Sequence, residues 1–127
     1  MKYILDTNVM VRFLVGDVPD QKKKAEQWFK EAESGKRDIL VPAVTIAEVS
    51  FVLESYYKLS REQIIEALTV FISQRWLEIP DRQELLLLWE WYRKGLHFVD
   101  SLLLAYSQVS DYGVLTFDKE MVKQIKS

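Results

Sequence analysis

The chain contains no cysteine and only one histidine in 127 residues. The absence of cysteine excludes disulfides and thiolate metal sites. The single histidine, His97, is more simply explained as a structural residue of a loop than as a catalytic base. No apolar run reaches the ~18 residues that a membrane span needs, and a strand pattern starts within residues 1–4, which leaves no room for a signal peptide. We therefore expect a cytoplasmic protein with no membrane segment.

An excess of positive charge is also missing. Seventeen Lys and Arg residues face 19 Asp and Glu residues, which gives a net charge of −2. Nucleic-acid-binding domains are usually basic, so this balance disfavours that class, although acidic site residues can mask a local basic rim. The apolar share of 49% is ordinary for a folded protein, and the length fits one domain, residues 1–127.

Short apolar segments of strand type alternate with longer segments of helical spacing. Strands are expected at 3–5, 39–41 and 114–116, with a weaker one at 76–79. Helices are expected over 9–15, 21–33, 45–57, 60–72, 81–94, 100–110 and shortly after 118. This alternation predicts an α/β fold with a central parallel sheet that helices cover on both faces.

Four acidic residues stand where strands end or helices begin: Asp6, Glu48, Asp100 and Asp118. Carboxylates at the carboxyl ends of parallel strands face the crevice in which open α/β sheets bind ligands. Several carboxylates that converge there repel one another unless a cation offsets their charge. Oxygen ligands suit a hard ion such as Mg²⁺ or Mn²⁺. The pattern therefore predicts a divalent-metal site and phosphodiester chemistry.

Each of these acids also has a purely structural explanation. Thr45 and Glu48 match a capping box, as do Ser60 and Gln63, and for Glu48 alone the capping role is favoured. Asp100 is a natural N-cap residue, and Asp118 lies in the first turn of a helix, where its charge suits the helix dipole. The occurrence of all four in one chain is what favours a functional site.

The motifs around the acids resemble those of the PIN-domain ribonucleases, and most of all their VapC-like toxins. The matching stretches are Leu5-Asp6-Thr7-Asn8-Val9, Thr45-Ile46-Ala47-Glu48-Val49, Asp100-Ser101-Leu102-Leu103-Leu104-Ala105 and Leu115-Thr116-Phe117-Asp118-Lys119. The resemblance implies a three-layer α/β/α sandwich, a divalent-metal site built from the four acids and endoribonuclease activity on structured RNA. It also implies a homodimer that a partner antitoxin inhibits. Many relatives continue into a short edge strand, whereas this sequence ends at Ser127.

The types of the candidate residues indicate a role for each of them in such a site. Asp6 and Asp100, with help from Asp118, are expected to hold the metal, which would lower the pKa of a bound water. Glu48 either orients or deprotonates that water, or binds a second metal. Asn8 and Thr116 are candidate hydrogen-bond donors to the phosphate or to a ligand water, although capping of local backbone is the simpler role for each.

The apolar segment 85–92 predicts more than one buried face. Trp89 and Trp91 lie ~200° apart around a regular helix, so a single core face cannot bury both. Either the helix is wedged inside the fold, or Leu87 and Trp91 contact a second protein chain. We expect the second arrangement, with a homodimer or an antitoxin as the partner.

Two other functions remain open. A receiver-like regulatory domain also combines a small parallel α/β fold with an acidic Mg²⁺ pocket, but no adjacent acidic pair follows the first strand here. A binding module that keeps the fold without the chemistry is disfavoured because all four acids are present.

Overall fold

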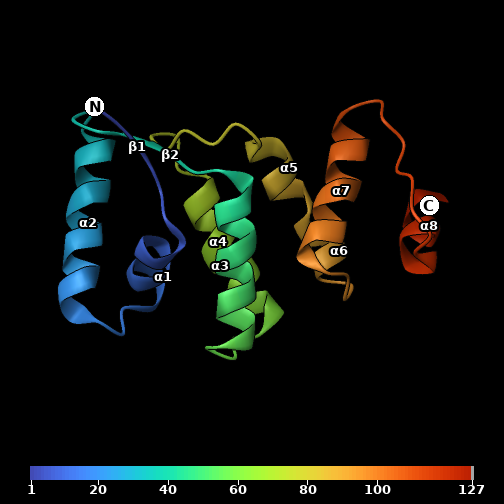
Figure 1. Cartoon of the computed structure of the whole chain (residues 1–127), viewed down its shortest axis with the longest axis horizontal. Helices are drawn as coiled ribbons and strands as arrows, with labels where there is room; N and C mark the ends of the chain where they lie inside the picture. The colour runs from blue at the N-terminus through green and yellow to red at the C-terminus, as the bar shows by residue number, and fades with distance from the viewer. Residues whose placement is uncertain (127) are drawn as a thin grey trace. The chain divides into compact units, whose positions relative to one another are not determined.

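The computed structural model describes the backbone of residues 1–126 and the side chains of residues 1–125. It divides into two compact units, Met1–Asp81 and Arg82–Ser127, each of which is described by itself. The first unit contains β1 (Lys2–Ile4), α1 (Thr7–Val15), α2 (Pro19–Glu33), β2 (Asp38–Leu40), α3 (Ala43–Ser55) and α4 (Arg61–Ile72). The second contains α5 (Arg82–Leu87), α6 (Trp89–Tyr92), α7 (Phe98–Val109) and α8 (Lys119–Lys126) (Figure 1).

The sheet of the first unit is parallel. Strands β1 and β2 pair with Tyr3 opposite Ile39, and the chain passes from one strand to the other through α1 and α2. A parallel bridge between Leu40 and Glu78 extends this pairing. The expected α/β class with a parallel sheet is confirmed, while the weak third strand at 76–79 is reduced to that bridge.

The strand expected at 114–116 is wrong for the described part of the chain, because this segment joins no sheet. The hydroxyl of Thr116 instead accepts a hydrogen bond from the backbone N–H of Asp118, at 3.0 Å. Such local bonds between side chain and backbone favour a turn over a sheet ladder. The side chains of Leu115 and Phe117 are fully exposed.

Helix packing fixes the frame on which the first unit presents its side chains. Helix α1 packs against both α2 and α3, and α3 packs against α4 (Figure 1). Ile64, Leu68 and Ile72 follow one another at intervals of four residues on α4 and are completely buried, as their helical spacing predicts. The expected capping box of α4 is confirmed, because Ser60 accepts from the N–H of Gln63 (3.2 Å) and Gln63 accepts from the N–H of Ser60 (2.9 Å).

A polar junction ties the end of α1 to the residues after α3. Arg12 donates to Asp17 (3.3 Å) and to the Tyr57 hydroxyl (2.9 Å), and this hydroxyl donates to Asp17 (2.7 Å). The Tyr57 hydroxyl, followed by Arg12, lowers the pKa of Asp17. Because the folded pKa is depressed, this contribution to stability is present above the unfolded pKa and is lost as the pH falls through the folded one.

In the second unit, Trp89 is 4% exposed and Trp91 8% exposed, so both indole rings are buried. The helix expected over 81–94 is assigned as two short helices on either side of Leu88, and it ends after Tyr92, where Lys94 donates to the carbonyl of Trp91, three residues earlier. The expectation that Trp91 lies at the surface against a second chain is therefore wrong, and the alternative of a segment buried on more than one side holds. Leu87 is half-buried, and its contact with a partner stays a prediction.

None of the described helices is both long and apolar enough to cross a bilayer.

Candidate active site

Asp6 and Glu48 line the same surface hollow of the first unit. The hollow has a volume of about 310 Å³, and its walls come from the end of β1, the start of α1 and the first turns of α3. Its lining residues are Ile4, Leu5, Asp6, Thr7, Pro42, Val44, Thr45 and Glu48. No Lys or Arg is among them, so no basic side chain that lines the hollow offsets the negative charge of the two exposed carboxylates.

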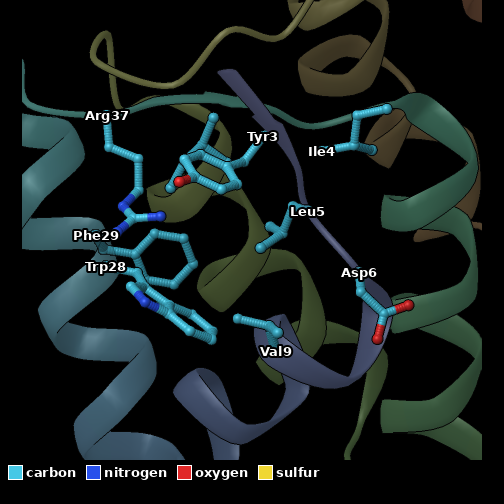
Figure 2. A pocket seen from close by; sticks show the side chains of 9 residues that line it. Tyr3, Ile4, Leu5, Asp6, Val9, Trp28, Phe29 and Arg37 are labelled. Carbon is cyan, nitrogen blue, oxygen red and sulfur yellow. The ribbon is translucent and has the colours of Figure 1, made fainter. Parts of the chain in front are cut away.

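The carboxylate of Asp6 has no structural role in its own helix. Asp6 occupies the N-cap position of α1 with an extended backbone, but its side chain accepts no hydrogen bond from the helix N-terminus. Figure 2 shows the carboxylate pointing away from the core, toward α3. An exposed carboxylate that is free of protein partners is available to a ligand.

The capping role expected for Glu48 is wrong. Helix α3 begins at Ala43, directly after Pro42, rather than after Thr45. The Thr45 hydroxyl is buried and donates to the backbone carbonyl of Leu5, at 3.1 Å. Pro42 occupies the N-cap position with an extended backbone, and the helix begins at the next residue. Glu48 lies one turn inside the helix, and its exposed side chain is left without a capping function.

Thr45 is thus a positioning residue that the sequence pattern did not identify. Its hydroxyl joins α3 to the last residue before Asp6, and so fixes the two elements that carry Asp6 and Glu48. Its appearance in a capping-box pattern concealed this role; the signal available in the sequence was the proline three residues earlier.

Thr45→Val is expected to destabilise the fold by about 1 to 3 kcal/mol, because the isosteric change leaves the Leu5 carbonyl without its buried donor. Denaturant unfolding at equilibrium measures this loss. Thr69→Val on α4, for whose hydroxyl the structure shows no such tertiary bond, is the matched control and is expected to change stability by much less. Equal stability of the two variants would contradict the role assigned to Thr45.

Asp100 and Asp118 line a second hollow, in the second unit. This hollow has a volume of about 370 Å³ and lies between the turn before α7 and the start of α8. Its lining residues are Lys94, Gly95, Leu96, His97, Asp100, Asp118, Glu120 and Met121. Glu120 pairs with Lys123 at 3.3 Å, which partly neutralises this added acid.

The cap roles of these two acids are the reverse of those expected. Helix α7 begins at Phe98 after His97, so Asp100 stands at the third helical position and is not the N-cap. Asp118 instead caps α8, because one of its oxygens accepts from the N–H groups of Glu120 (2.8 Å) and Met121 (3.1 Å). The carboxylate of Asp100 is left half-buried in the hollow without a cap bond.

The two candidate donors occupy different positions. Asn8 is exposed in the first turn of α1 and lines a neighbouring hollow with Arg12 and Lys24. Thr116 holds the turn before α8 through its bond to the Asp118 N–H and thereby orients that acid. His97 lines the second hollow through its position at the start of α7, where its carbonyl accepts from the buried Ser101 hydroxyl (2.8 Å).

The donor set fits a hard divalent cation. All four acids supply carboxylate oxygens, and the Asp6–Glu48 pair has no protein cation in its hollow. The described residues of either unit bring no cluster of three acidic or histidine side chains together tightly enough to hold a metal ion by themselves. Each hollow by itself therefore offers two of the four acids, with oxygen ligands of the type that Mg²⁺ and Mn²⁺ prefer.

Two comparisons with known proteins give a match. The sequence pattern of the PIN domain matches residues 3–126, which is nearly the whole chain. A VapC ribonuclease of Aquifex aeolicus (strain VF5) is 33% identical over 70 residues, which cover 55% of this chain and 51% of that protein. The alignment thus spans about half the length of this curated relative. No solved structure matches the chain significantly. Because the match covers nearly the whole chain, the chain belongs to the PIN domain family.

Proposed function

We propose that this chain, as a single PIN domain over residues 1–127, is a metal-dependent endoribonuclease of the VapC type. The observation that carries the proposal is the hollow that Asp6 and Glu48 both line. Both carboxylates are exposed there, neither caps its helix, and no Lys or Arg lines the wall. Acids held in this way, without a structural task, are suited to bind a cation or to accept a proton.

Asp6, Asp100 and Asp118 are the residues that we propose as ligands of Mg²⁺ or Mn²⁺. An ion bound there would polarise the phosphodiester and lower the pKa of a bound water. Asp118 has one oxygen engaged with the N-terminus of α8 and the other without a cap bond. A carboxylate fixed in this way is a pre-oriented ligand, because its rotamer is already set by the helix.

Glu48 is proposed to act on the attacking water. Its carboxylate accepts the proton of a water that attacks phosphorus in line, as the bond to the 3′ oxygen breaks and that oxygen takes a proton from solvent. The products are a 5′-phosphate and a 3′-hydroxyl. Asn8 carries an exposed amide beside Arg12 and Lys24, so we assign it to the substrate phosphate. Thr116 acts through Asp118, which it orients.

The proposed partners follow from the family. We propose a cytoplasmic toxin that forms a homodimer and is inhibited by a cognate antitoxin. Leu87 remains the candidate for the contact between chains. It lies in a shallow hollow with Leu86, which is 36% exposed, so this part of α5 offers apolar surface.

The activity is tested with purified chain and structured RNA in Mg²⁺, in Mn²⁺ and in EDTA. Cleavage is expected with either metal, to stop in EDTA and to return when Mn²⁺ is added in excess. Sequencing of the new RNA ends is expected to show 5′-phosphates at discrete sites. Glu48→Gln, purified in the same way, controls for contaminating nucleases and is expected to lose the activity. Cleavage that survives EDTA, or that Glu48→Gln retains in full, would count against the proposal.

A further inference from the structure

A half-buried tryptophan, Trp28 on α2, separates two hollows of the first unit. One, of about 260 Å³, is also lined by Tyr3, Arg37 and the proposed catalytic Asp6, whose carboxylate points away from it toward α3 (Figure 2). The other, of about 270 Å³, also contains Lys24 and the proposed substrate contact Asn8. The indole thus forms a wall of both hollows, and each of them reaches a residue of the candidate active site.

The first hollow is built from flat groups over an apolar floor. The guanidinium of Arg37 lies over the Tyr3 ring, with 4.4 Å between its Cζ and the ring centroid, and 6.0 Å from the centroid of Trp28. Phe29 and Ile39, each less than 5% exposed, lie beneath. Tyr3 is 39% exposed and Trp28 is half-buried, so both present part of their surface to solvent.

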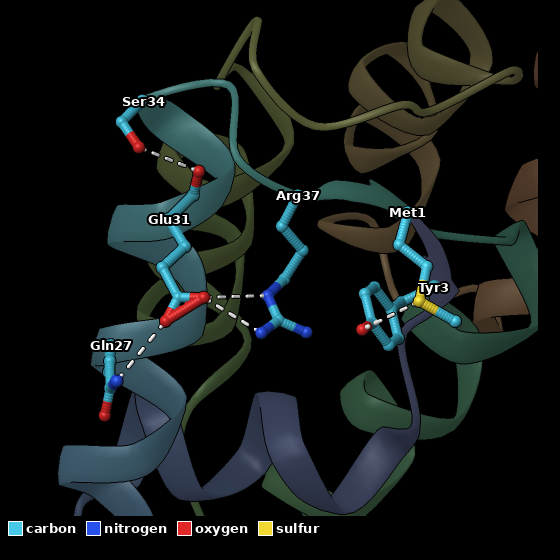
Figure 3. Close-up of polar contacts among 6 residues, drawn as sticks. All are labelled: Met1, Tyr3, Gln27, Glu31, Ser34 and Arg37. Atoms are coloured by element: carbon cyan, nitrogen blue, oxygen red, sulfur yellow. Dashed lines mark hydrogen bonds and ion pairs between the residues drawn. The ribbon is translucent and has the colours of Figure 1, made fainter.

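Glu31 holds Arg37 in this orientation. One oxygen of Glu31 accepts from both Nε (3.2 Å) and Nη2 (2.9 Å) of Arg37, and Gln27 donates to the other oxygen (3.3 Å) (Figure 3). The ion pair fixes the guanidinium by its edge and leaves its planar face for stacking. Such a preorganised plane loses little conformational freedom when a second flat group stacks beside it.

The second hollow places positive charge beside Trp28. The Lys24 ammonium lies 5.8 Å from the centroid of the indole ring. Among the residues that the structure describes, no carboxylate forms an ion pair with Lys24. Lys22 and Lys23 precede it in the same helix. An aromatic face with an unpaired cation beside it is the arrangement that binds single-stranded nucleic acid, where bases stack and phosphates follow the charge.

We infer that Trp28 is a stacking platform for an unpaired base of the RNA substrate, with the base in the hollow of Tyr3 and Arg37 and the adjoining phosphate near Lys24. The inference rests on the proposed ribonuclease function and deepens it, because it assigns single-stranded RNA as the bound form. An apolar protein segment would fill the same floor, but it would leave the cation beside the indole unused. RNA uses both features and would place its backbone beside Asp6 and Asn8.

The test measures RNA binding separately from cleavage. Full-length Asp6→Asn protein in EDTA is titrated with fluorescent single-stranded RNA of about 12 nucleotides, within the range of known site sizes, and with the same strand lacking its bases. Adding Trp28→Leu is expected to weaken binding of the intact strand roughly tenfold, the usual value for one lost base stack, and to leave the base-free strand unaffected. Trp28→Phe is expected to restore most of the affinity.

Two controls separate stacking from other losses. Tyr56→Leu removes an aromatic ring that is 74% exposed at the far end of α3 and is expected to leave RNA affinity unchanged. Lys24→Gln is expected to weaken both strands equally and to lower the salt dependence of binding, whereas Lys30→Gln on the same helix is not.

Unchanged affinity in Trp28→Leu would overturn the inference and assign the hollow to a protein segment. Equal loss for both strands, with a lower melting temperature, would also overturn it and make Trp28 a core residue. If the wild-type chain cleaves RNA in either case, the proposed function stands and only the base site is lost. If the chain neither binds nor cleaves RNA, both are wrong.

Discussion

Asp6→Asn is expected to lower the rate of RNA cleavage by at least about 100-fold, the scale typical of losing one charged group that acts in a transition state. The change keeps the shape of the side chain and removes its charge. Because the Asp6 carboxylate is exposed and accepts no bond from its helix, folding is expected to be unaffected. Single-turnover cleavage assays and thermal melts in EDTA measure the two quantities.

Asp38→Asn is the matched control for this prediction. Asp38 is an exposed acid on the neighbouring strand β2, outside the hollow that Asp6 shares with Glu48. It is expected to keep full activity. A large drop in melting temperature for Asp6→Asn would mean that this carboxylate supports the fold, and full activity would remove Asp6 from the site.

Prediction from the sequence worked best where a structure depends only on residues that are close together in the chain. The Ser60–Gln63 box forms as predicted because nothing outside those residues competes for its hydrogen bonds. The parallel pairing of the first two strands was equally accessible, since the run of helical residues between them requires a crossover. The four acids could be named as candidates because their motifs are visible in one dimension, and their roles in a site stay predictions.

The failures have more than one physical cause: a tertiary contact in the case of Thr45, and a local hydrogen bond in the case of Thr116. Thr45 matches the pattern of a capping residue, yet the helix begins earlier, after Pro42. The Thr45 hydroxyl instead donates to the carbonyl of Leu5, which is distant in the sequence. Residues 114–116 are of strand-forming types, yet the Thr116 hydroxyl accepts a hydrogen bond from the backbone N–H of Asp118 and holds a turn. The burial of Trp91 was missed because a single buried face was assumed for this segment, whereas it is buried on more than one side.

A misplaced helix start exchanged the expected roles of Asp100 and Asp118. Side-chain preference alone favoured Asp100 as a cap, because Asp before an apolar run is a common helix start. The structure starts α7 at Phe98, which leaves Asp100 inside the first turn, and it gives the cap to Asp118. Sequence could rank the residue types but could not locate the first helical hydrogen bond.

This exchange leads to a prediction that separates stability from catalysis at one position. Asp118→Ala is expected to lose both the α8 cap, at about 1 kcal/mol of folding stability, and RNA cleavage. Asp118→Asn is expected to retain the cap, since Asn is an equally good N-cap residue, and still to lose cleavage because the charge is gone. Denaturant unfolding in EDTA and cleavage in Mn²⁺ give the two readouts.

Asp100→Ala completes the comparison within the same hollow. It removes an acid that does not cap its helix, so it is expected to abolish cleavage without the loss of stability seen in Asp118→Ala. Titration calorimetry is expected to show weaker Mn²⁺ binding for the variants of both Asp100 and Asp118, because each residue supplies a carboxylate oxygen that is proposed to bind the metal. If Asp118→Asn cleaves RNA as well as the wild type, then capping is the whole role of Asp118, and the metal would be held without it.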